Sequence, residues 1–225
     1  VGTITENQTS LFSMPWVEAV MSSSVQLTHS LVPYVIIACD PNGGGDSQMA
    51  LVSVVFQRGQ MCIVGLDSHA VRGHDEIEKL LLAHVAALRI QWPNAWFIFV
   101  GESNLGQETD HMRHMLRLHG YVYCVCEKGL AGVRTTNQRK ELYAMELCKF
   151  ISQEACVIEE TLVVQNPFVD SRTRKKNTLD TLRKQLIGFR KLVLQSSSGR
   201  SEPRVSYTGK AQGAQDDLVI TMSIA

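Results

Sequence analysis

The sequence predicts one α/β domain with a mixed central sheet, in which three antiparallel strands precede two parallel strands and helices cover both faces. The first observation is a set of three apolar runs at 34–39, 49–56 and 61–66, separated by short turn sequences. Strands joined by such short turns pair antiparallel. The second observation is a helical stretch between two further apolar runs at 96–100 and 121–126. A strand–helix–strand order favours parallel pairing with a right-handed crossover.

Apolar residues at helical spacing predict the remaining elements. Helices are expected at 75–92, 108–118, 137–153, 178–194 and 215–225. A further short strand is expected at 161–165. A meander followed by βαβ-like units is the layout of the RNase H-like superfamily, but a fold of this kind does not establish a function.

Composition excludes several classes of protein. The 225 residues are 44% hydrophobic and 20% charged, which is typical of a globular domain with a real core. The net charge is zero, which argues against a protein that binds nucleic acid through bulk positive charge alone. A local basic surface is still compatible with this net charge, because acidic residues elsewhere would balance it. The six cysteines form no CxxC pair, which favours buried free thiols in a reducing compartment. No apolar run of membrane-spanning length occurs.

The first 30 residues are polar and rich in Ser and Thr. We interpret 1–30 as an arm or linker that arrives from an upstream domain, and 31–225 as the folded domain. The chain begins without Met and stops within an apolar helical pattern, so we expect a fragment of a larger protein.

Acidic residues stand at the ends of three predicted elements. Asp40 follows an apolar strand, Glu102 follows another, and Asp216 and Asp217 open the last helix. Each acid alone also fits ordinary turn or helix-cap chemistry. The first and fourth strands of the expected sheet are neighbours, so their ends bring Asp40 and Glu102 together. Clustered carboxylates bind hard divalent cations, and two such ions can stabilise both the attacking and the leaving oxygen of a phosphodiester displacement.

Asp216 and Asp217 lie about 100° apart around a helix, so they cannot both face one site. We favour Asp216 as the direct ligand and keep Asp217 as a ligand that assists or as a helix cap. Asp67 ends the third strand and is a weaker candidate, because an acid in that place is a natural turn residue.

Four segments, taken in order, resemble the C-terminal nuclease domain of herpesvirus terminase large subunits. They are VIIACDPNGGG at 35–45, FIFVGESN at 97–104, GVRTT at 132–136 and DDLVI at 216–220. The resemblance covers roughly residues 33–225, with a leaning towards the gammaherpesvirus branch.

The resemblance implies an RNase H-like fold and a metal-dependent endonuclease that cuts concatemeric viral DNA into genome units with little sequence preference. It implies two divalent cations, Mg²⁺ or Mn²⁺, on Asp40, Glu102, Asp216 and Asp217. It further implies double-stranded DNA, other terminase subunits and the capsid portal as partners, in the host nucleus. The family's upstream ATPase domain is not expected in this sequence, because a GxxxxGK[ST] loop is missing, so ATP is not expected to bind here.

Basic residues supply the expected contacts to DNA phosphates, which carry charge but no sequence information. They cluster in a loop-rich stretch and along the next helix, and a hydroxyl residue before another helix joins them. The set is Arg172, Arg174, Lys175, Lys176, Lys184, Lys210 and Thr135. A solvated face or plain helix capping is the alternative interpretation.

Two other functions remain open from the sequence. One is a catalytically silent RNase H-like module that assembles with other packaging subunits. The other is a related nuclease of the resolvase or integrase type, which a preference for DNA junctions or strand transfer would distinguish.

Overall fold

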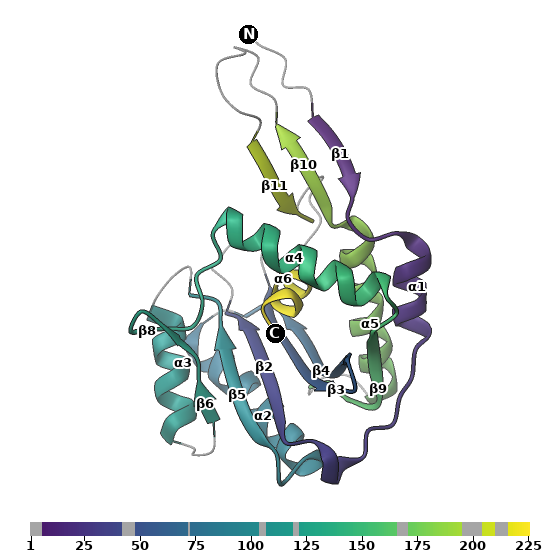
Figure 1. Cartoon of the computed structure of the whole chain (residues 1–225). Helices are drawn as coiled ribbons and strands as arrows, with labels where there is room; N and C mark the ends of the chain where they lie inside the picture. Colours follow the sequence, from purple (N-terminus) through teal and green to yellow (C-terminus); the bar gives the residue numbers. More distant parts are fainter. Residues whose placement is uncertain are drawn as a thin grey trace.

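A computed structural model describes residues 6–41, 48–71, 73–103, 107–118, 122–165, 171–194, 204–209 and 216–225. The largest sheet formed by these residues has the strand order β6-β5-β2-β3-β4-β9 (Figure 1). Its strands are β2 (Tyr34–Asp40), β3 (Met49–Gln57), β4 (Gln60–His69), β5 (Trp96–Gly101), β6 (Val122–Cys124) and β9 (Cys156–Val163).

The pairing in this sheet confirms the predicted mixed topology. Strands β2, β3 and β4 form an antiparallel meander, and β5 and β6 continue the sheet in parallel from β2. The sheet also gains β9, which pairs parallel with β4 and begins five residues before the short strand expected at 161–165. The central strands are buried on both faces, which explains why they are continuous apolar runs.

Helices cover both faces of the sheet, as predicted. They are α1 (Met14–Ser22), α2 (His74–Gln91), α3 (Gln107–Leu118), α4 (Asn137–Ser152), α5 (Ser171–Gly188) and α6 (Asp217–Ile224), with a short 3₁₀ helix η1 (His29–Leu31). Helices α2 and α3 pack on one face, and α1, α4, α5 and α6 pack on the other (Figure 1). Within the described ranges, no helix combines the length and the apolar character needed to cross a membrane.

Part of the N-terminal segment, from Phe12 to Val25, packs against the rest of the domain. Phe12, Val17 and Val20 are at most 2% exposed and pack with α4, α5 and α6. The backbone of Val25 pairs with Glu159 of β9. The polar composition of 1–30 hid this packing, because only a few apolar side chains anchor the segment.

A second sheet of three strands projects from the body (Figure 1). It joins β1 (Glu6–Ser10), β10 (Arg190–Leu194) and β11 (Arg204–Thr208), all antiparallel. The helix expected at 178–194 therefore ends at Gly188, and the residues after it become β10. The hydroxyl of Tyr207 donates to Glu141 of α4 at 2.9 Å and ties this sheet to the body.

Asp67 belongs to a buried network on the α2 face. Its Oδ2 lies 2.6 Å from Nδ1 of His84, whose Nε2 lies 2.7 Å from the hydroxyl of Ser53. A Cβ on Gly65 would come within 2.9 Å of the His84 ring, so glycine makes room for it. Asp67 also accepts the backbone N–H of Gln165 at 2.7 Å. The weaker metal candidate is thus a structural residue that links β4 to α2 and to the end of β9.

Candidate metal centre

Asp40 and Glu102 come together where two neighbouring parallel strands end. Cys39 of β2 is in register with Gly101 of β5, and the backbone N–H of Glu102 donates to the carbonyl of Cys39 at 2.8 Å. Side chains alternate along a strand, and Cys39 belongs to the core on the α2 side. Asp40 and Glu102 therefore project on the opposite face, where α6 packs.

The thiol of Cys39 is buried next to Asp40 at the end of β2. Burial raises its pKa well above the usual value, and the negative charges of Asp40 and then Glu102 raise it further. All six cysteines are free thiols. Cys39 is consequently held as a neutral thiol.

The backbone of Glu102 is held from several directions. The hydroxyl of Thr109 donates to its carbonyl at 2.8 Å, and the next residue, Ser103, donates its N–H to Val133 at 2.8 Å. A Cβ on Gly132 would lie 2.2 Å from the carbonyl oxygen of Gly101, and Gly132 also has a φ of +80°. Only glycine permits the 131–133 segment to approach β5 this closely.

Thr135 holds the side chain of Glu102. Its hydroxyl donates to Glu102 Oε1, and both side chains are buried, at 7% and 5% exposure. The sequence predicts that Thr135 precedes a helix and contacts DNA, and the helix does begin two residues later, with Thr136 as its N-cap. Positioning of a carboxylate is a role that the sequence pattern did not reveal, because the two residues lie 33 apart.

We expect Thr135→Val to weaken divalent-metal binding by about 10–100-fold, the usual effect of removing a group that orients a metal ligand. The change removes the hydroxyl while keeping the shape of the side chain. Calorimetric titration of Mn²⁺ is the measurement, and Thr135→Ser is the matched control, because it keeps the hydroxyl. Equal metal affinity for the Val and Ser variants would show that the hydrogen bond has no positioning role.

The last helix brings two consecutive aspartates to the same region with different partners. Asp216 Oδ2 accepts the hydroxyl of Thr208 at 3.1 Å and the N–H of Gly209 at 2.9 Å. Asp217 Oδ2 accepts the N–H of Gln48 at 3.1 Å. Asp216 is thereby bonded to the end of β11. Asp217 is directed towards the start of β3, beside the end of β2.

Asp40, Glu102 and Asp217 share one edge and one face of the sheet. Asp217 is 2% exposed, and Asp40 is half-buried. In the described part of the chain, however, no group of three or more His, Cys, Asp and Glu side chains is gathered closely enough to hold a metal ion. The donor set is all carboxylate oxygen, which suits Mg²⁺ or Mn²⁺. Mutual repulsion favours carboxylates that stay apart until a cation binds.

The predicted basic residues occupy a different part of the molecule. Arg172, Lys175 and Lys176 line a hollow of about 350 Å³ between α5 and Met21 of α1. Lys184 is exposed further along α5, Arg174 also belongs to that helix, and Lys210 lies outside the described residues. Helix α5 stands on the flank away from β5 and β6 (Figure 1). The structure therefore does not bring Arg172, Lys175, Lys176 or Lys184 to Glu102.

Comparison with known proteins supplies a likeness of fold. No family model and no curated protein matches the sequence. The human cytomegalovirus terminase nuclease domain, soaked with manganese, is similar in structure with a TM-score of 0.64 and 12% identity, over 95% of this chain and 93% of that one. The large terminase nuclease of thermophilic phage G20c, with bound magnesium, has a TM-score of 0.57 and 15% identity, over 96% and 95%. The chain thus has the mixed α/β, RNase H-like fold of terminase nuclease domains.

Proposed function

We propose that this chain is the nuclease domain of a DNA-packaging terminase that hydrolyses phosphodiester bonds of double-stranded DNA with divalent metal ions. The observation that carries the proposal is the common edge and face shared by Asp40, Glu102 and Asp217. Support comes from the fold likeness to two terminase nuclease domains whose structures contain manganese or magnesium. The proposal that the protein comes from a herpesvirus, and that its branch is the gammaherpesviruses, rests on the resemblance of the four sequence segments.

Asp40, Glu102 and Asp217 are the residues that would hold two Mg²⁺ or Mn²⁺ ions. Such ions, when bound, supply Lewis acidity and a hydroxide nucleophile near neutral pH. The protein contributes a rigid frame for the ligands, since Thr135 and Thr109 fix Glu102 and Gln48 orients Asp217. The sequence favours Asp216 as the direct ligand. We instead assign it a structural role, in which its carboxylate connects the start of α6 to the end of β11.

The wider assignments follow from the same proposal. DNA would be contacted by the basic set on α5, namely Arg172, Arg174, Lys175, Lys176 and Lys184, and by Lys210. Other terminase subunits and the capsid portal would be the protein partners, in the host nucleus. The product would be genome-length DNA cut from concatemers with little sequence preference.

Incubation of supercoiled plasmid with the protein and Mn²⁺, Mg²⁺ or EDTA tests the proposal. We expect nicking followed by linearisation with either metal and none with EDTA, because hydrolysis needs the cations that the carboxylates hold. Cleavage that persists in EDTA would exclude a metal-dependent nuclease.

One observation favours a second candidate, an assembly module without catalysis. The described residues include no preassembled group of three metal donors. Absence of both cleavage and Mn²⁺ binding in the same preparations would support that module. Mn²⁺ binding with cleavage would exclude it.

A further inference from the structure

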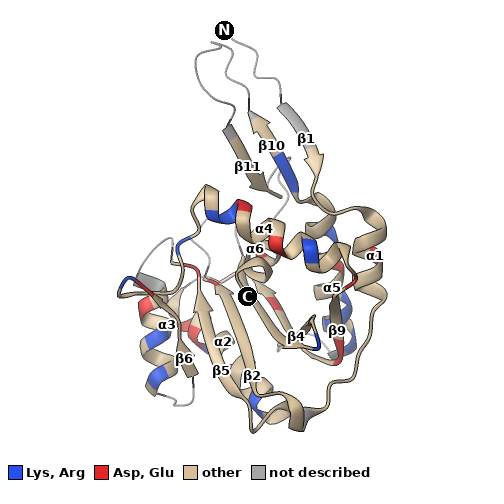
Figure 2. Ribbon diagram, viewed as in Figure 1, with Lys and Arg blue, Asp and Glu red and all other residues tan. Residues whose placement is uncertain are grey.

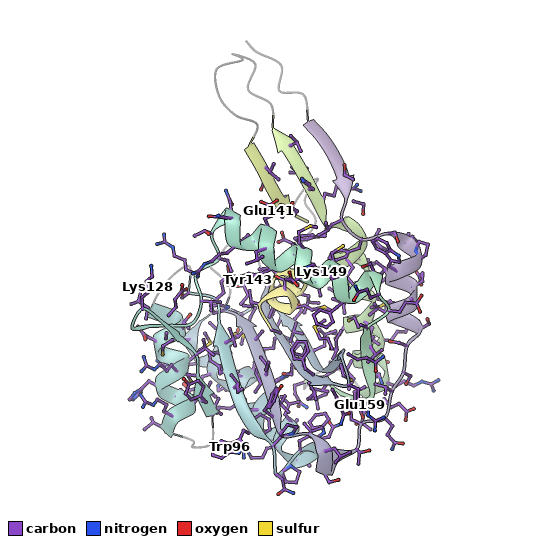
Figure 3. All side chains as sticks on the ribbon, in the orientation of Figure 1. Trp96, Lys128, Glu141, Tyr143, Lys149 and Glu159 are labelled. Atoms are coloured by element: carbon purple, nitrogen blue, oxygen red, sulfur yellow. The ribbon has the colours of Figure 1, made fainter. Side chains whose placement is uncertain are left out.

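Three cations lie on the hairpin and helix start that flank the segment contacting Glu102, on the side of the molecule opposite α5 (Figure 1). Lys128 sits at the turn between β7 (Cys126–Glu127) and β8 (Leu130–Ala131), and Figure 3 shows it at the edge of the molecule. Arg134 precedes α4 and is exposed, and Lys140 is half-exposed in the first turns of that helix. We call Lys128, Arg134 and Lys140 the hairpin–helix surface. In Figure 2, the blue of Lys and Arg residues marks the hairpin and the start of α4.

An ion pair beneath this surface holds the hairpin against α4. The two terminal guanidinium nitrogens of Arg139, Nη1 and Nη2, donate to the carboxylate of Glu127. This hydrogen bonding lowers the pKa of Glu127 to about 2, so the acid stays ionised and paired with Arg139. The same guanidinium donates to the carbonyl of Arg134 at 3.3 Å. The charges of Glu127 and Arg139 neutralise each other. This ion pair therefore does not change the net positive charge of the hairpin–helix surface.

The hairpin–helix surface adjoins the candidate metal centre through the backbone. Val133 pairs with Glu102 as a parallel bridge, and Thr135 binds the Glu102 side chain. Arg134 stands between these two residues and is exposed. Arg134 is therefore adjacent in sequence to both residues that contact Glu102.

A positive charge near the N-terminus of a helix, such as that of Lys140 in α4, is electrostatically unfavourable. The first turn of a helix favours negative charge, yet α4 has no acidic residue there and carries Arg139 and Lys140 close to its start. Arg139 is compensated by Glu127. No ion pair of Lys128, Arg134 or Lys140 occurs among the described residues. Such an arrangement is stabilised when an anion binds outside the helix.

We propose that the hairpin–helix surface binds backbone phosphates of the DNA strand that is cut, next to the scissile bond. This inference rests on the proposed nuclease function. The carboxylates of the metal centre repel a polyanion, and exposed charges act only within about 8–10 Å at physiological ionic strength. Cations beside Glu102 can offset that repulsion locally. Cations on α5 stand on the other flank and would hold a more distant part of the duplex.

Fluorescence anisotropy of a labelled duplex, measured in EDTA at several salt concentrations, tests the surface without any cleavage. The variant is Lys128→Ala/Arg134→Ala/Lys140→Ala. Its matched control is Arg58→Ala/Lys79→Ala/Lys149→Ala, which removes the same charge from exposed positions outside the hairpin–helix surface. A second variant, Arg172→Ala/Lys175→Ala/Lys176→Ala, tests the basic set on α5. Thermal melting establishes that each variant is folded, and an Arg134→Gln single variant replaces the triple one if the latter melts early.

For the hairpin–helix variant we expect weaker binding and a salt dependence, d log K/d log[salt], shallower by about 3, because each lost phosphate contact removes roughly 0.9 from the slope. The control should keep the wild-type slope. For Arg134→Gln the expected change in slope is about 1.

Wild-type affinity and slope in the hairpin–helix variant would overturn the proposal. Equal losses in the variant and the control would also overturn it, since total charge would then explain the binding. A wild-type protein that cuts plasmid while the variant binds normally would keep the nuclease function. A variant that loses DNA affinity while the wild type never cuts would keep the surface and remove the nuclease.

Discussion

Asp40→Asn and Glu102→Gln should each reduce metal-dependent plasmid cleavage to the level seen in EDTA, with the fold retained. Each change keeps the size and shape of the side chain and removes the charge that attracts a divalent cation. Glu102→Gln also keeps an oxygen that can accept the Thr135 hydroxyl. The carboxylates of Asp40 and Glu102 repel each other when no cation is bound. Loss of either charge relieves this repulsion, so we expect the melting temperature to stay level or rise.

The readouts are plasmid cleavage, Mn²⁺ affinity and the melting temperature, taken from the same preparations. Asp75→Asn is the control, because this exposed residue is in the first turn of α2, on the other face of the sheet. It should cut as the wild type does. Metal-dependent cleavage that survives in both the Asp40 and Glu102 variants would place the metal centre elsewhere.

The two consecutive aspartates at the start of α6 should respond in opposite ways. Asp217→Asn is expected to abolish cleavage with little effect on stability, because the amide oxygen still accepts the N–H of Gln48. Asp216→Ala is expected to lower the free energy of unfolding by about 1.5–3 kcal/mol, since a buried carboxylate loses charge-assisted hydrogen bonds from Thr208 and Gly209. For a domain of this size, each kcal/mol lowers the melting temperature by roughly 2–4 °C.

Cleavage by the Asp216 variant is measured below its melting transition, where part of the activity should remain. Asp216→Asn is a milder companion that keeps an acceptor for the β11 backbone. The reverse pattern, with an active Asp217→Asn and an inactive but stable Asp216→Asn, would restore Asp216 as the metal ligand.

Local patterning in the sequence determined five strands of the central sheet and placed two of the three candidate ligands at strand ends. Strands buried on both faces need continuous apolar residues, so the runs before Asp40 and Glu102 are visible in a short window. Short turns determine antiparallel pairing of β2, β3 and β4, and the helix between β5 and β6 determines a parallel pair. Neighbouring strand ends then place Asp40 beside Glu102.

Only the tertiary structure decided how the remaining residues are used. Residues 190–194 suit a helix by periodicity, yet they pair with β1 from the other end of the chain. Asp216 and Asp217 are chemically identical, and they differ in their hydrogen-bond partners, which are Thr208 and Gly209 for Asp216 and Gln48 for Asp217. Thr135 contacts Glu102 because Gly132 lets its segment approach β5. The physical reason is that local spacing records which side chains are buried, whereas the partner of a buried polar group is set by contacts between distant parts of the chain.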